Sequence, residues 1–103
     1  MSDFAEKLLS KVKKTLRQTG DEFDEEIGSY IDTAAMDLTN SGILSSYFEG
    51  SCDTDPQIVQ AVRWYCLSVF GLYNSDMEKY LKAYSSLKAT LCTQRKYTTE
   101  VPK

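Results

Sequence analysis

The helical spacing of apolar residues is the feature that most constrains the fold of this 103-residue chain. In four segments, at about 3–17, 21–40, 55–70 and 76–92, apolar side chains recur at steps of three and four residues. That spacing lines one face of an α-helix, and no useful length of the chain shows the two-residue alternation of a half-buried strand. We therefore expect an all-α fold, a small bundle of four helices with a loop between the second and third.

The length and the apolar content indicate one small domain. An apolar fraction of 42% allows a hydrophobic core, and 103 residues are typical of a single domain. After Thr93 the chain is too polar to pack alone. We expect a helical domain over 1–93 and a C-terminal tail over 94–103 that is either flexible or ordered by assembly against another subunit.

The first two expected helices carry recognisable start and stop residues. Asp3 fits the N-cap position of the first helix, and Thr19 with Glu22 forms a possible capping box for the second. Gly20 can take up the left-handed turn between them. These residues predict a first helix that ends near Arg17 and a second that begins at Asp21.

The third and fourth expected helices have equally clear starts. Asp55 is a good N-cap residue, and the proline that follows it suits the first helical position. The segment that begins there is apolar nearly all round, with Arg63 as its only charge, so it should be the most buried helix. The run 75–78 reads Ser-Asp-Met-Glu, a capping box for the fourth helix.

Aromatic residues outside the helical stripes are the better candidates for an interface. The loop-like segment 41–55 is rich in glycine, serine and aspartate, yet it contains Tyr47 and Phe48. Either these apolar residues pack back on the bundle, or they form a short helix that docks on a partner. The interface candidates in this segment and the tail are Tyr47, Phe48, Arg95 and Tyr97, and Tyr73 is a further aromatic candidate before the fourth helix.

Charge is distributed unevenly along the chain. Residues 1–17 carry a net charge of +3, residues 18–62 hold ten acids and no lysine or arginine, and residues 63–103 carry +4. An asymmetry of this kind bears on partners more than on fold. The candidate surfaces are a basic row (Lys7, Lys11, Lys14) and an acidic helix start (Glu22, Glu25, Glu26).

The residue content argues against most enzyme chemistry. Histidine is absent, which removes the common nucleophile systems and the commonest metal ligand. Cys52, Cys66 and Cys92 form no C-x-x-C pair, so we expect neither a disulfide framework nor a zinc site. The last two lie on apolar helical faces and are expected to be small buried hydrophobes. No catalytic residue, cofactor or metal site is expected.

The chain shows no targeting signal. Its first residues turn polar and basic without the apolar core of a signal peptide. Its longest apolar stretch, around 64–73, is too short to span a bilayer. We expect a cytosolic protein without a membrane partner.

An ordered series of residues spans roughly positions 8–97. The series is Leu8-Leu9-x-x-Val12-Lys13-x-x-Leu16-Arg17, Asp24-Glu25-Glu26-Ile27, Ile31-x-x-Ala34-Ala35-x-Asp37-Leu38, Gly42-Ile43, Asp55-Pro56-x-Ile58-x-x-Ala61, Tyr65, Phe70-Gly71, Asn74, Tyr84-x-x-Leu87-x-x-x-Leu91 and Tyr97. In its order and spacing, more than in any single motif, it resembles the tailed-phage head-tail connector family.

The resemblance implies a structural protein with no active site. Members are all-α subunits that form a ring, usually twelvefold, under the portal protein of the filled head. The ring seals or extends the DNA exit channel and offers a surface to the next head-completion or tail protein. The implied location is the head-tail junction of the virion, with the host bacterial cytoplasm during assembly, and DNA passes through the ring without sequence-specific binding.

A ring requires that one patch of a subunit meet a different patch on the next copy. We predict that the acidic start of the second helix faces a basic surface of the adjacent subunit, from the first or the fourth helix. The same acids and bases also stabilise helix ends within a monomer, and the two explanations are compatible. The alternative function is a small helical regulator that binds nucleic acid or a partner protein through its basic first helix.

Overall fold

The apolar stripes of the sequence form four long helices, which confirms the all-α prediction. The computed structural model describes residues 2–49, 55–70 and 76–99. The helices are α1 (Asp3–Leu16), α2 (Asp24–Asn40), α3 (Pro56–Val69) and α4 (Met77–Cys92), with the short helices η1 (Ser45–Phe48) and α5 (Arg95–Thr98). In the part of the chain that the structure describes, no residue belongs to a strand.

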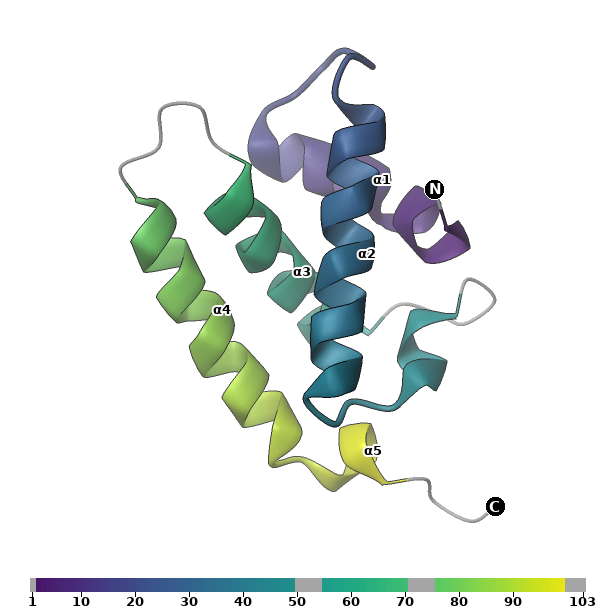
Figure 1. Cartoon of the computed structure of the whole chain (residues 1–103), viewed down its shortest axis with the longest axis vertical. Helices are drawn as coiled ribbons and strands as arrows, with labels where there is room; N and C mark the ends of the chain where they lie inside the picture. Colours follow the sequence, from purple (N-terminus) through teal and green to yellow (C-terminus); the bar gives the residue numbers. More distant parts are fainter. Residues whose placement is uncertain (1, 50–54, 71–75, 100–103) are drawn as a thin grey trace.

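Helix α3 lies at the centre of the packing. It contacts α4 along its length and also contacts α1 and α2, while α1 crosses the upper end of α2 in Figure 1. The core residues come from all four long helices, from the loop after α2 (Ile43) and from α5 (Tyr97): Phe4, Ala5, Leu8, Val12, Ile27, Ile31, Ala34, Leu38, Ile43, Ile58, Val59, Ala61, Val62, Cys66, Tyr84, Leu91 and Tyr97. Six residues of α3 are buried, more than in any other helix, as its apolar sequence predicts.

The ends of α1 differ from the sequence-based prediction by one residue. Ser2, not Asp3, is the N-cap, and its hydroxyl accepts a hydrogen bond from the Ala5 amide at 3.1 Å. Arg17, not Gly20, takes the left-handed conformation, with φ of 59°. The chain leaves the helix there because the Gln18 amide bonds back to the Lys13 carbonyl at 2.9 Å, as in a Schellman motif.

Helix α2 begins at Asp24, three residues later than predicted, and the expected capping box of Thr19 and Glu22 does not form. Phe23 occupies the N-cap position without a side-chain cap. Its ring instead packs against Phe70, with the ring centroids 5.4 Å apart. A tertiary contact thus sets the helix start in place of a local capping motif.

The predicted start of α3 is confirmed. The Asp55 carboxylate accepts hydrogen bonds from the amides of Gln57, at 2.9 Å, and Ile58, at 3.4 Å. Helix α4 begins one residue after Asp76. Ser75, the first residue of the predicted capping box, lies outside the described residues, as do Gly71, Tyr73, Asn74 and Cys52.

The segment after α2 packs back on the bundle, as one of the two interpretations of the sequence proposed. Ile43 is buried, and Tyr47 and Phe48 pack against the core from η1. The expected tail also folds: Tyr97 is fully buried in α5, and its carbonyl accepts a 2.7 Å hydrogen bond from the Leu44 amide. In the structure residues 95–98 thus form a short helix against the bundle, whereas the division into a domain over 1–93 and a C-terminal tail over 94–103 stays a prediction.

Helix α4 is less buried than its apolar stripe suggests. Only Tyr84 and Leu91 are buried, whereas Leu81 keeps 49% of its surface exposed. Cys92 is half-buried, which corrects the expectation that it is a buried hydrophobe, while Cys66 is buried as expected. Among the described residues, no helix combines the length and apolar character needed to cross a membrane.

Candidate assembly surface

The basic row on α1 is a surface feature. Lys7, Lys11 and Lys14 are all exposed, and their spacing of four and three residues places them on one side of the helix. Lys13 has a different role, because it points to the start of α2. Its Nζ lies 2.8 Å from Asp24 and 3.4 Å from Asp21, and the bond to Asp24 raises the pKa of Lys13.

The acidic side chains near the start of α2 fall into two groups. Asp21 and Asp24 pair with Lys13 inside the chain. Glu22 and Glu25 are exposed, and neither has an ion-pair or hydrogen-bond partner among the residues that the structure describes. Asp24, Glu25 and Glu26 all lie in the first turn of α2, so the local explanation through the helix start applies to these glutamates as well. Glu22 and Glu25 also remain available to a partner, and the two explanations stay compatible.

Glu26 is exposed but is also engaged within its own helix. It accepts a 2.9 Å hydrogen bond from the hydroxyl of Tyr30, one turn later. This bond, followed by partial burial, raises the pKa of Tyr30. Substitution of Glu26 would disturb an internal contact, so Glu25 is the cleaner position for a charge-reversal experiment.

Two shallow hollows border these charged residues. One opens on α1, beside Lys13, and the other lies along α2. The first is lined by Glu6, Leu9, Ser10, Lys13, Lys14 and Gln18. The second is lined by Glu25, Ser29, Asp32 and Thr33.

The aromatic interface candidates serve mainly to build the domain. Phe48 packs edge-to-face on Phe4, with ring centroids 5.4 Å apart. Tyr47 contacts the ring of Tyr97 at 5.1 Å and donates a 2.6 Å hydrogen bond to the Lys96 carbonyl. Tyr97 is fully buried and is not available to a partner in this conformation.

Tyr97 also links α5 to the start of α3. Its hydroxyl donates a 2.9 Å hydrogen bond to Asp55, the N-cap residue of α3. Burial, followed by this carboxylate, raises the pKa of Tyr97. Arg95 is exposed on the same short helix and is the one candidate of the tail that remains at the surface.

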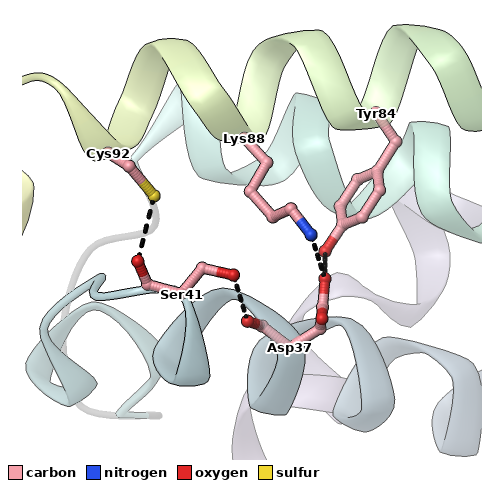
Figure 2. Close-up of polar contacts among 5 residues, drawn as sticks. All are labelled: Asp37, Ser41, Tyr84, Lys88 and Cys92. Carbon is pink, nitrogen blue, oxygen red and sulfur yellow. Dashed lines mark hydrogen bonds and ion pairs between the residues drawn. The ribbon is translucent and has the colours of Figure 1, made fainter.

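Asp37, Tyr84 and Lys88 form the α2–α4 clasp, a polar cluster not expected from the sequence. Figure 2 shows that both side chains of α4 point to the carboxylate of Asp37 on α2. The Tyr84 hydroxyl donates a hydrogen bond to that carboxylate, and Lys88 Nζ lies 3.1 Å from it. One turn further along α4, the Cys92 thiol donates to the Ser41 carbonyl at 3.3 Å.

The electrostatics of the clasp favour a carboxylate ion facing a neutral phenol. Partial burial opposes ionisation of Asp37, but the hydrogen bonds from Tyr84 and Lys88 outweigh it and lower its pKa. Burial, followed by the bond to Asp37, raises the pKa of Tyr84. The spacing of four residues between Tyr84 and Lys88 is the only sequence signal of this cluster, and it does not identify Asp37 as the partner.

A family model described as a phage connector protein matches residues 8–98. The chain belongs to this phage connector family. The match confirms the resemblance noted in the sequence, and it spans most of α1 and all of the later helices. Comparison with curated proteins and comparison with solved structures give no significant match.

Family membership assigns this phage connector a structural role in a phage. The structure keeps the basic row of α1 and the exposed glutamates near α2 as separate surfaces, and it places three of the four candidates from the loop and tail against the domain. In the part of the chain that the structure describes, no group of three or more cysteine, aspartate or glutamate side chains is arranged to hold a metal ion.

Proposed function

We propose that this phage connector forms a homo-oligomeric ring at the portal vertex and joins the DNA-filled head to the tail. The observation that carries the proposal is the family match over residues 8–98. The ring binds the portal protein on one side and the next head-completion or tail protein on the other. Twelve copies are the number that the family resemblance implies.

The charge distribution supports a ring. A closed ring is built from heterologous contacts, in which two different patches of the same chain meet. The basic row lies on α1, whereas Glu22 and Glu25 lie at the other end of the α1–α2 connection and are exposed. Opposite charges on separate elements of one chain orient neighbouring copies and speed their association.

In the proposed ring, DNA passes through the channel without sequence-specific recognition. Binding to the DNA backbone requires a surface rich in lysine and arginine. Residues 18–62 contain ten acids and neither of these basic residues, so this region is unsuited to contact with phosphate. Charges at the rim of a subunit contact are also screened by salt, which provides a test.

The test is a mass measurement of the protein alone and mixed with portal rings at several salt concentrations. We expect multi-copy complexes on the portal, with a copy number that matches the ring, and fewer complexes as salt rises. Portal rings that leave the protein monomeric at every salt concentration would contradict the connector ring.

A charge reversal separates the ring from the charge contact. Glu25→Lys should weaken assembly and leave the fold intact, because the side chain is exposed. Glu78→Lys on α4, where the side chain is 83% exposed, is the matched control. If neither salt nor Glu25→Lys changes assembly, the proposed charge contact between subunits is contradicted and the connector role stands.

A second candidate function rests on the exposed row of Lys7, Lys11 and Lys14. A small helical regulator would use this row to bind nucleic acid as a free monomer, with strong salt dependence. A gel shift at low salt that disappears when the three lysines become glutamates would favour it. A free monomer that shifts no DNA at low salt would remove this candidate.

A further inference from the structure

Met36 on α2 is an exposed apolar side chain that could contact another copy of the chain. It exposes 65% of its surface on α2, more than any other large apolar side chain among the described residues. It shares the outward stripe of α2 with Glu25, Ser29 and Thr33, since these positions fall close together on a helical wheel. A single exposed apolar residue is ordinary on a monomer, so Met36 needs a complementary surface before it indicates a contact.

The hollow on α1 is that surface. Leu9, half-buried against the core, lies among its lining residues, and the aliphatic chains of Lys13 and Lys14 add apolar wall. The hollow is already shaped in the isolated chain, because Lys13 is held by Asp24 at 2.8 Å and by Asp21 at 3.4 Å. A flexible thioether side chain adapts well to a small apolar hollow of this kind.

The charges of the two surfaces, the outward stripe of α2 and the hollow on α1, indicate which partner each of them binds. The outward stripe of α2 lies within the stretch 18–62 that has ten acids and no basic residue, whereas residues 1–17, which include α1, carry +3. Within the two surfaces, the stripe carries Glu25 and no basic residue, whereas the hollow carries Lys14 beside Lys13, which is already paired with Asp24 and Asp21, and one acid, Glu6. Glu25 on one surface and Lys14 on the other therefore give the two surfaces opposite charges. That pattern favours a heterologous contact between two copies of this chain over a two-fold symmetric one.

We propose that the outward stripe of α2 in one copy docks on α1 of the next copy, with Met36 inserted in the hollow around Leu9. This contact rests on the proposed ring and identifies the surfaces that join its subunits. It also resolves the choice left by the sequence, because it assigns the basic partner of α2 to α1 and not to α4.

A photo-crosslinking amino acid at position 36 tests the geometry directly. In assemblies formed with portal rings, or by the protein alone where it self-associates, the crosslink should join two copies and map to the 6–18 segment of the second. The same probe at position 81, an exposed apolar residue of α4, is the control and should not label that segment. Crosslinks from position 36 that reach only other segments, or only the portal, overturn the proposal.

Paired substitutions test the energetics. Met36→Asp should weaken the contact about ten-fold or more, as removal of a central interface side chain does, whereas Leu81→Asp should not. Reversal of Glu22 and Glu25 to lysine, or of Lys11 and Lys14 to glutamate, should each impair assembly, and the combined set should restore it. Equal impairment by Met36→Asp and Leu81→Asp, or no restoration, contradicts the contact.

The outcomes also separate this contact from the proposed function. Multi-copy assemblies on the portal that tolerate Met36→Asp and the charge reversals retain the connector ring and overturn the α1–α2 contact. A protein that associates neither with itself nor with the portal overturns both.

Discussion

Helices α3 and α4 lie side by side, yet the structure holds them in different ways. Helix α3 buries six residues, five of them apolar, and its one charged side chain is Arg63. Helix α4 buries only Tyr84 and Leu91 and keeps Leu81 half-exposed. Its position depends instead on directed contacts, namely the clasp to Asp37 and the stacking of Tyr80 on Trp64 at 5.8 Å.

The difference separates two physical functions within one small core. Burial of apolar surface supplies most of the stability but has no direction, so it does not by itself fix how one helix is positioned along another. A hydrogen bond to a carboxylate has a required distance and angle, and it adds a modest net stability. We infer that α3 supplies most of the stability and that the α2–α4 clasp sets the register of α4.

The largest expected effect on stability comes from a substitution in the core face of α3. Ile58→Ala removes a fully buried side chain and should lower the free energy of unfolding by about 2–5 kcal/mol, because it loses apolar burial and leaves a cavity. Denaturant unfolding followed by circular dichroism measures it. Gln57→Ala, an exposed neighbour on the same helix, is the control and should change stability by less than about 0.5 kcal/mol. If Ile58→Ala and Gln57→Ala lower the free energy of unfolding by similar amounts, burial on α3 does not supply most of the stability.

A smaller effect is expected at the clasp. Tyr84→Phe keeps the buried ring and removes only the hydroxyl that donates to Asp37. We expect a loss of about 1.5 kcal/mol, the low end for a bond to a charged group, because the Asp37 side chain is 41% exposed and can be solvated. The matched control is Tyr80→Phe, since no hydrogen bond of the Tyr80 hydroxyl is found among the described residues. Hydrogen exchange should show faster opening of α4 in Tyr84→Phe alone.

The smallest expected effect is on the pH dependence of stability, and it again distinguishes the clasp that holds α4 from the buried core of α3. The pKa of Asp37 in the folded chain is lowered from its ordinary value of 3.8, so the folded state favours the ionised form. The stability that the clasp adds is therefore present above that value and is lost as pH falls through the lowered pKa. Asp37→Asn should flatten the acid limb of the stability curve, whereas Ile58→Ala should shift the whole curve without changing its slope. An unchanged acid limb in Asp37→Asn would contradict this role.

Several parts of the fold follow from local sequence. The four long helices and the Asp55 cap of α3 are set by residues within one or two turns of each other, where spacing and capping preferences act directly. The location of the charged surfaces also follows from the sequence, because a helical wheel places Lys7, Lys11 and Lys14 on one side. The family resemblance likewise depends on ordered local motifs, and the family match confirms it.

Other parts depend on contacts between residues far apart in the chain. Helix α2 starts after Phe23 because the Phe23 ring packs against Phe70. The tail folds because the Tyr97 hydroxyl donates a hydrogen bond to Asp55 and the Tyr97 carbonyl accepts one from the Leu44 amide. The sequence alone determined the helices, the main core and the segregation of charge, since these depend on periodicity and composition. The start of helix α2, the clasp at Asp37 and the docking of α5 depend on the tertiary fold, because each needs a partner that no local spacing reveals.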